Sequence, residues 1–268
     1  MASIDTIYAM VGNWIALFVV GFLTFSVFRN FLRKKTTGTL LLFTTYLVLF
    51  IVRILTEIQK ILQALGYFND AIMIMMTISI TSSLLVSIFL YAFGCRGLIT
   101  DSEYTRTLVV TFLAMVTGGL FTIMIIGIYI DLPGIFTLNI SQQTADIKTI
   151  SATFVTIIMI IVQMIIYFRL AISSFRLAKN SEELVRKRGF QFIAWGLVIY
   201  IIGGVLSGAS SALPDSMYMT MIIETIRRLI FITAYIMLYI GWTMPDWFRK
   251  RVRRKSWFTK QYVAEIRT

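Results

Sequence analysis

The sequence lacks histidine altogether and holds a single cysteine, Cys95, among its 268 residues. Histidine is the commonest general base and the commonest metal ligand near neutral pH, so its absence removes the usual Ser-His catalytic pair and most metal sites. One cysteine cannot form an intrachain disulfide. We therefore expect a chain that is not an enzyme and that binds neither a metal nor a cofactor.

Charged residues are also scarce, at 14% of the chain, against about a quarter in a typical soluble domain. Hydrophobic residues make up 58% and come in runs too long for a soluble core. A membrane crossing needs roughly 20 predominantly apolar residues. Such runs cover about residues 8–31, 39–62, 71–95, 107–130, 149–175, 189–212 and 217–243. The sequence thus predicts an all-α, polytopic membrane protein, with a bundle of seven transmembrane helices over residues 1–244.

Proline is rare as well, and its three residues all lie in predicted loops or at a helix end. Because proline is the usual cause of a sharp kink, we expect fairly straight helices. Small residues four apart let helix backbones approach closely in lipid, and they occur at Ala114 and Gly118 and at Gly204 and Gly208. We interpret both pairs as contacts within the bundle rather than as dimer faces. The sequence does not fix the oligomeric state.

Basic residues outnumber acidic ones by 25 to 13, which gives a net charge of +12. Of these 25, 20 lie at the helix junctions of about residues 29–35, 96–106 and 169–188 or in the tail after Pro245. Cytoplasmic segments carry such an excess of Lys and Arg, so we expect the N-terminus outside and the C-terminus in the cytoplasm. The charge then suits contact with anionic lipid, and no soluble domain is left to bind nucleic acid.

The tail, residues 245–268, is predicted to form a short amphipathic helix that starts at Pro245. Its aromatic and basic residues lie mostly on different faces, which is typical of a helix lying in the membrane interface. The predicted membrane-surface residues are Trp247, Phe248, Arg249, Lys250, Arg251, Arg253, Arg254 and Lys255. We favour an anchor that fixes the topology over the alternative, a docking site for a cytoplasmic protein partner.

Two predicted helices carry charged residues well inside the membrane, where each costs roughly 3 kcal/mol or more near the centre. At a rise of about 1.5 Å per residue, Arg53 and Glu224 lie at similar depth, about 10 Å below the outer boundary. We predict an ion pair between them. Glu57 can reach Arg53, and Glu224 can reach Arg228, at i,i+4 spacing. Arg227 is then left short of a partner and can attract an anionic ligand from outside.

This charged group has two interpretations that the sequence leaves open. It is either an ion cluster that fixes the register of the helices or a pocket for a small or lipid anion. Ser79, Ser83 and Ser87 form a hydroxyl stripe at four-residue spacing, and Gln163 is another polar residue deep in a helix. These side chains are candidates for lining the same interior, although such stripes more often form hydrogen bonds between helices.

The last two predicted helices carry distinctive junctions. Residues 186–196 read RKRGFQFIAWG, and residues 241–249 read GWTMPDWFR. Together with the topology, they resemble the corresponding junctions of microbial seven-helix sensor modules, such as those at the N-termini of some histidine kinases. Those modules continue into a signalling domain, whereas this sequence has a short tail. The resemblance implies a stand-alone sensor or a membrane partner for a separate cytoplasmic protein. We predict a receptor-like sensor that relays to a cytoplasmic partner. The alternatives are a small-solute transporter and a scaffold that acts through its basic tail.

Overall fold

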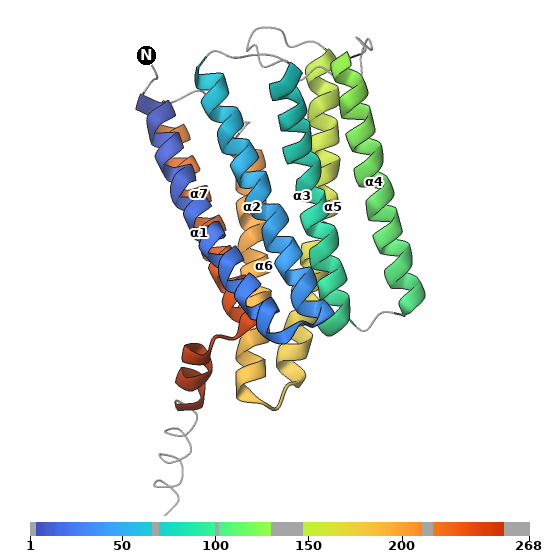
Figure 1. Cartoon of the computed structure of the whole chain (residues 1–268), viewed down its shortest axis with the longest axis vertical. Coiled ribbons are helices and arrows are strands. Elements are labelled where there is room, and N and C mark those ends of the chain that lie inside the picture. The colour runs from blue at the N-terminus through green and yellow to red at the C-terminus, as the bar shows by residue number, and fades with distance from the viewer. Residues whose placement is uncertain (1–3, 66–69, 100–101, 130–146, 211–216, 255–268) are drawn as a thin grey trace, which may run out of the picture.

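The computed structural model describes residues 4–65, 70–99, 102–129, 147–210 and 217–254. The long helices in these ranges are α1 (Ile4–Lys34), α2 (Thr37–Ala64), α3 (Asp70–Gly97), α4 (Glu103–Tyr129), α5 (Ile147–Asn180), α6 (Leu184–Ser210) and α7 (Met217–Thr243) (Figure 1). A short tail helix follows at residues 246–254. All seven long helices are long and apolar enough to cross a membrane. The predicted all-α bundle is confirmed, and the chain is an integral, multi-pass membrane protein.

Two helices extend well beyond their predicted ends. α5 continues to Asn180 and α6 begins at Leu184, so most of the basic segment between them is helical. This segment is stabilised locally by an ion pair between Arg186 Nε and Glu183 Oε2 at 2.8 Å. A run of apolar residues marks only the part of a helix that lies in hydrocarbon, because backbone hydrogen bonds can continue the helix into water. Hydropathy therefore locates the crossing better than it locates the ends of the helix.

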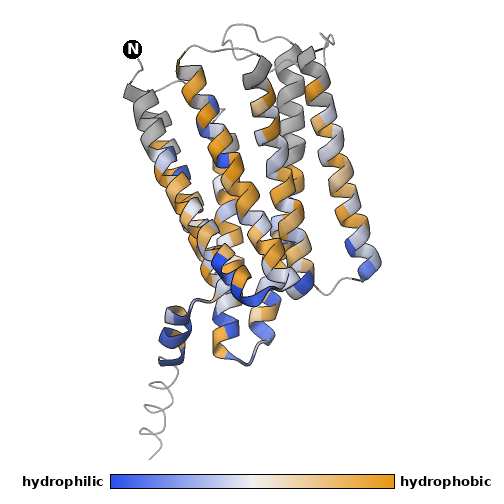
Figure 2. Cartoon of the chain, in the orientation of Figure 1, coloured by the Kyte–Doolittle hydropathy of each residue, from blue (hydrophilic) through white to orange (hydrophobic). Residues whose placement is uncertain are grey.

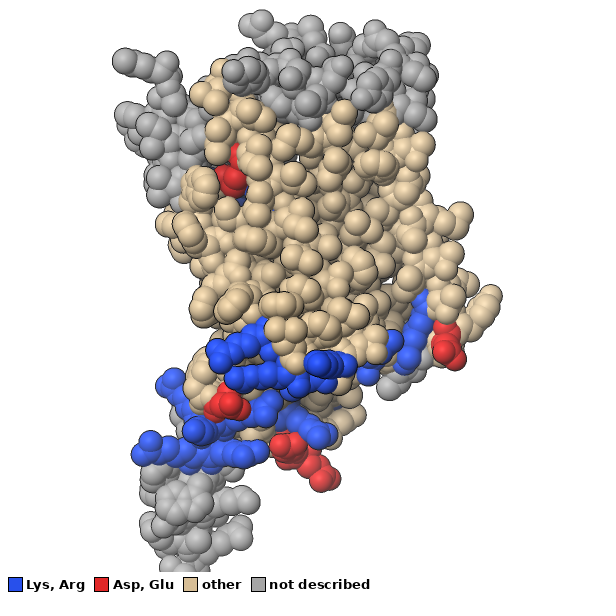
Figure 3. All heavy atoms as spheres, viewed as in Figure 1, with Lys and Arg blue, Asp and Glu red and all other residues tan. Residues whose placement is uncertain are grey.

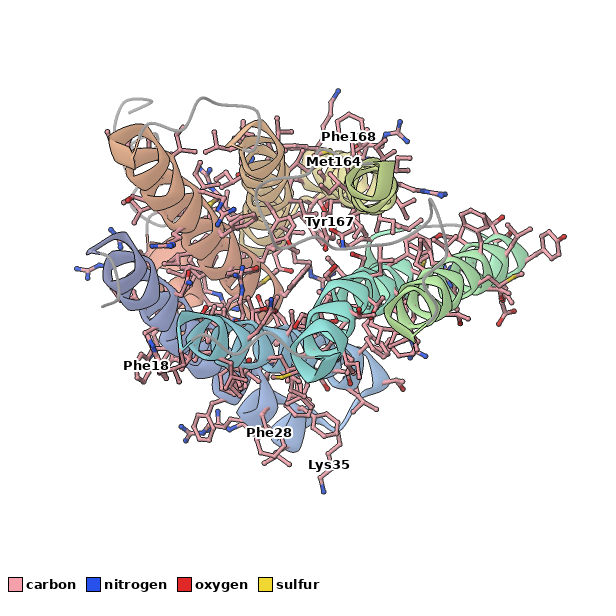
Figure 4. All side chains as sticks on the ribbon, turned by 90° about the horizontal axis from the view of Figure 1, so that it is seen from above. Phe18, Phe28, Lys35, Met164, Tyr167 and Phe168 are labelled. Atoms are coloured by element: carbon pink, nitrogen blue, oxygen red, sulfur yellow. The ribbon has the colours of Figure 1, made fainter. Side chains whose placement is uncertain are left out.

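Six of the helices form a closed ring, in the order α1, α2, α3, α5, α6 and α7, with α7 returning to α1. We call this the six-helix ring. α4 lies outside it and packs mainly against α3 among the described residues. Figure 4 looks along the bundle and shows α4 reaching away from the other helices.

Apolar residues predominate along the described stretches of the helices (Figure 2), and many of the large ones are exposed. Figure 4 shows Phe18 of α1 and Phe168 of α5 pointing away from the bundle, and these side chains are 73% and 60% exposed. Large contiguous apolar surfaces are rare on soluble monomers. Lipid is the solvent that suits such a surface.

Glycines bring α6 and α7 into close contact. Gly189, Gly196 and Gly203 recur at every seventh residue of α6, and each lies against α7. A Cβ added at Gly241 of α7 would lie 2.9 Å from the backbone oxygen of Gly189. Backbones that approach this closely leave no room for a methyl group, so the contact depends on glycine on both helices. We call this contact the glycine seam.

The two small-residue pairs differ in where they face. Ala114 and Gly118 of α4 are exposed, and nothing lies within 4 Å of a Cβ placed on Gly118. The expectation that this pair packs within the bundle is wrong, because α4 buries its opposite side, including Leu113, against the ring. Gly204 of α6 does pack within the bundle, with its added Cβ 3.6 Å from a methionine of α5. The surroundings of Gly208 lie outside the part of the chain that the structure describes.

Lys and Arg gather at one end of the bundle, which also carries the tail helix (Figure 3). We call it the basic end. α1 starts near the opposite end (Figure 1), as an odd number of crossings requires. Charge asymmetry predicts that the basic end faces the cytoplasm.

Candidate functional site

A cavity of about 260 Å³ lies among α1, α2 and α7, toward the end of the bundle opposite the basic end. Its lining residues are Asn13, Ala16, Arg53, Thr56, Arg227, Arg228, Phe231, Ile232 and Tyr235. We call it the arginine cavity. Three arginines face this space, and among the side chains that the structure describes no carboxylate lines it.

The arginine cavity lies along the middle part of α7. This helix runs from Met217 to Thr243. At about 1.5 Å per residue, Arg227 and Arg228 lie roughly 15–17 Å from its start, and Tyr235 lies roughly 27 Å from it. The hydrocarbon core is about 30 Å thick, so these residues lie well inside the membrane.

Arg53 crosses the cavity from α2 to α7. Its Nη2 donates a hydrogen bond to the Tyr235 hydroxyl at 3.3 Å. Glu57, one turn further along α2, is buried and interacts electrostatically with Arg53, as the i,i+4 spacing predicts. The arginine is therefore held between a carboxylate of its own helix and a phenol of α7, which lowers the cost of its charge in the membrane.

The predicted pair between Arg53 and Glu224 stays a prediction, since the side chain of Glu224 lies outside the described residues. The structure does show that α2 and α7 each pack extensively against α1. Arg53 has the length to bridge the two helices, and it does so through Tyr235.

Arg227 and Arg228 are consecutive residues about three turns into α7, and each interacts with other groups of the chain. Arg227 is therefore not left without a partner, which corrects the prediction. The physical reason is that an isolated guanidinium at this depth is costly. The guanidinium of Arg228 occupies the position that a Cβ of Gly12 would take, so α1 leaves room for it by carrying glycine there.

Asn13 is a polar lining residue that sequence reasoning missed. It is buried, with 8% of its surface exposed, and within the described part of the chain its Nδ2 has no hydrogen-bond partner. A buried amide without a partner is unfavourable, so this group is suited to donate to a ligand. The available signal was an asparagine inside an otherwise apolar run of α1.

The serine stripe joins α3 to α5 and does not line the arginine cavity. Gln163 Nε2 donates to Ser83 Oγ at 3.0 Å, and Ser87 Oγ lies 2.9 Å from the Tyr167 hydroxyl. Ser79 is buried on the same face of α3. Ser83 and Ser87 therefore correspond to the hydrogen-bonding alternative, because their hydroxyls contact side chains of α5 rather than of α7. The Ser79 hydroxyl is buried and has no hydrogen-bond partner in the described part of the chain.

Tyrosines fill the centre of the bundle just inside the arginine cavity. The rings of Tyr235 and Tyr200 lie 5.9 Å apart, and Tyr200 meets Tyr167 edge to face at 4.8 Å. Figure 4 shows Tyr167 pointing toward the middle of the bundle. The hydroxyl of Tyr46 donates to the backbone oxygen of Tyr235 at 3.4 Å. Sequence reasoning missed this cluster because tyrosines spaced far apart along the chain show no local pattern.

Aromatic contacts continue from these tyrosines to the basic end. Tyr46 meets Trp242 edge to face at 6.4 Å, and Trp242 meets Phe93 at 5.5 Å. Trp242 lies in the last turn of α7. We call Tyr235, Tyr200, Tyr46, Trp242 and Phe93 the aromatic column. It connects the arginine cavity with the basic end through side chains of α2, α3, α6 and α7.

No protein family, curated protein or solved structure matches this chain. The resemblance to microbial sensor modules therefore stays a prediction. The structure does bring its two segments together, because Gly189 and Gly241 meet in the glycine seam. Among the residues described, no group of Cys, Asp and Glu side chains is placed to hold a metal ion.

Proposed function

We propose that the protein is a receptor-like membrane sensor whose arginine cavity binds a small anion or the anionic group of a lipid. One observation carries the proposal: three arginines and a buried asparagine amide face a cavity of about 260 Å³ that no described carboxylate lines. Ionisable residues inside a membrane bundle commonly mark a binding site or pathway. The proposal involves no catalytic step, metal or cofactor.

The lining also limits the kind of anion. The volume is slightly below the roughly 300–1,000 Å³ that is usual for small-molecule pockets, so the ligand is small. Phe231, Ile232 and Ala16 supply apolar wall beside the arginines. A carboxylate or phosphate that carries a short alkyl group matches this combination, since guanidinium groups bind both anions in bidentate fashion.

A signal requires the ligand to bind one conformation better than another. An anion that draws Arg53 away from the Tyr235 hydroxyl would favour a different packing of Tyr235 in the aromatic column. The column reaches the basic end at Trp242 and Phe93. We propose that a cytoplasmic partner protein detects the resulting shift of the helix ends there.

Calorimetric titration of the purified chain in detergent with sodium acetate, octanoate and phosphate tests the binding step. We expect at least one of these anions to bind the parent, and Arg227→Gln to weaken that binding by about 10-fold or more, because hydrogen bonds to charged groups contribute about 1.5–3 kcal/mol. Arg96→Gln removes an exposed arginine that does not line the cavity, and its affinity should equal that of the parent. Equal affinities for Arg227→Gln and the parent would contradict the proposal, as would no binding of any anion.

Flux measurements separate sensing from transport. The same anion, radiolabelled, is presented to proteoliposomes that contain the parent or Arg227→Gln. A sensor should bind the anion without accumulating it inside the vesicles. Uptake by the parent that Arg227→Gln abolishes would replace the sensor with a transporter that uses the same cavity.

A further inference from the structure

We propose a second anion site, independent of the arginine cavity, at the basic end of the molecule. It lies between the ends of α1 and α7 and the start of the tail helix. Its ligand is the headgroup of a multiply charged phospholipid in the leaflet that meets the basic end. This goes beyond general attraction of a basic tail to a membrane, because it is a defined cavity with a defined stoichiometry.

The cavity has a volume of about 390 Å³, within the range that is usual for small-molecule pockets. Four of its lining residues are cations, namely Arg29, Arg33 and Lys34 of α1 and Arg249 of the tail helix. The only carboxylate among its described lining residues is Asp246. We call it the basic-end cavity. Residues separated by more than 200 positions in the sequence thus converge on one space.

The four cations form no ion pair within the described ranges of the chain. Like charges that share a cavity repel one another, and an anion between them removes this repulsion. The C-terminal end of α1 favours its three cations through the helix dipole. Arg249, however, lies in the first turn of the tail helix, where the dipole disfavours a cation. A bound anion accounts for its placement.

The tail helix is held in a fixed position relative to α6. Met244 adopts a left-handed backbone with φ of 42°, which turns the chain between α7 and the tail helix. Its side chain packs on Gly189. Phe248 is buried and meets Phe192 of α6 edge to face at 5.1 Å. Arg249 follows Phe248 directly, so its side chain is already positioned before a ligand binds, which favours affinity.

The depth of the cavity matches lipid headgroups. α1 and α7 end at Lys34 and Thr243, at the basic end, and both of these residues line the cavity. The headgroup region of each leaflet is about 5–8 Å thick. The stretch from Arg29 to Lys34 rises by about 8 Å, so its cations cover this region. A phosphate attached to a lipid is held at this level by its acyl chains, whereas a free phosphate is not.

The charge balance favours a headgroup with more than one negative charge. A phosphodiester with one charge would leave two of the four cations unbalanced, even with Asp246 present. A phosphomonoester or a headgroup with two phosphates balances more of them. Arginine binds phosphate in bidentate fashion, and three of the four cations are arginines.

Native mass spectrometry of the detergent-solubilised full chain tests this site. In separate samples, the chain is mixed with the same amount of phosphatidic acid or of phosphatidylglycerol. Phosphatidic acid carries a phosphomonoester, whereas phosphatidylglycerol carries a phosphodiester with one charge. We expect one phosphatidic acid to bind per chain, more tightly than phosphatidylglycerol. Arg29→Gln with Arg33→Gln should weaken this binding by about 30-fold, since each basic residue near anionic lipid contributes about 1 kcal/mol and about 1.4 kcal/mol is a factor of ten.

Two further variants control for charge and for folding. Arg176→Gln with Lys179→Gln removes the same charge from exposed positions of α5 that do not line the cavity, and this variant should bind as the parent does. Asp246→Asn removes the carboxylate and should strengthen binding, which a misfolded protein would not do. Equal weakening by both double variants would overturn the proposal in favour of diffuse attraction.

The remaining outcomes also decide the question. Equal binding of phosphatidylglycerol and phosphatidic acid would overturn the preference for multiple charges. If an equal amount of sodium pyrophosphate displaces phosphatidic acid, the site binds free phosphate groups, which would contradict the proposal that its ligand is a lipid. Failure of the arginine cavity to bind any anion leaves these measurements unaffected, because Arg227 does not line the basic-end cavity.

Discussion

Arg53 and Tyr235 form a hydrogen bond between two helices that both pack against α1. Hydrogen bonds between membrane helices contribute on average about 0.6 kcal/mol and at most about 1.7 kcal/mol, since the separated helices find other partners. The bond therefore matters more for the position of Arg53 in the arginine cavity than for the stability of the bundle.

Tyr235→Phe removes the acceptor and keeps the ring. We expect the free energy of unfolding in detergent to fall by about 0.6–1.7 kcal/mol, and the affinity for the anion of the arginine cavity to rise, because Arg53 no longer has to leave a partner. Tyr104→Phe, at an exposed position of α4, is the matched control and should change neither quantity. Unchanged anion affinity in Tyr235→Phe would contradict the proposed competition for Arg53.

A substitution at Gly12 tests the role of the Arg228 position in anion binding without changing any charge. In Gly12→Ala the new methyl group takes the space of the Arg228 guanidinium, which has to move because it is the flexible end of a long side chain. We expect weaker anion binding by calorimetry and a change in stability of about 1 kcal/mol or less. Gly118→Ala adds a methyl group where nothing lies within 4 Å, so its anion affinity should match that of the parent. The same affinity in Gly12→Ala would show that Arg228 does not bind the anion.

The arginines of the cavity and the partner of Arg53 on its own helix, Glu57, were predictable from the sequence, whereas the partners on other helices were not. Arg53, Arg227 and Arg228 stand out because a charge inside an apolar run needs a reason. Asn13 and Tyr235 are ordinary in a membrane helix, and only the packing of α1 and α7 brings them to the arginines. Contacts between distant elements have no local signature in one sequence.

Among the helices, the glycine seam is the contact with the least tolerance for change. A Cβ at Gly241 would lie 2.9 Å from both a backbone oxygen and a backbone nitrogen of α6, and neither can rotate away. The helices would have to separate, which reduces their packing along the whole seam.

Gly241→Ala should therefore lower the free energy of unfolding by about 1–3 kcal/mol, the usual cost of overpacking. The measurement is thermal or denaturant unfolding in detergent. Gly204→Ala makes an ordinary contact at 3.6 Å and should be neutral or slightly stabilising. If both variants unfold at the same temperature, the close approach of α6 and α7 is not rigid.

Helix positions followed directly from hydropathy, because lipid requires a continuous apolar run for each crossing. Hydropathy did not predict which face of each helix lies inside the bundle and which faces lipid. In α4 both sides are apolar or small, so the side with Leu113 and the side with Gly118 are indistinguishable by composition. Only the packing against α3 shows which of them faces lipid.

At the scale of the whole molecule, charge distribution predicts the orientation. The seven crossings place the first helix start and the tail at opposite ends of the bundle, and Lys and Arg collect at the end with the tail (Figure 3). We expect a tag at the C-terminus to be accessible from the cytoplasm and a tag at the N-terminus only from outside. Protease accessibility in intact and permeabilised cells measures both. Cleavage of both tags from the same side would contradict the seven-crossing topology.

The position of α4 outside the six-helix ring has a consequence for the path of the chain. α3 and α5 are neighbours in the ring and run in the same direction, so the chain has to cross the membrane once more between them. α4 supplies this return crossing and adds little to the interior. Its sequence is consequently free to diverge as long as it stays apolar and keeps its length, whereas α3 and α5 are constrained by the partners on both of their sides.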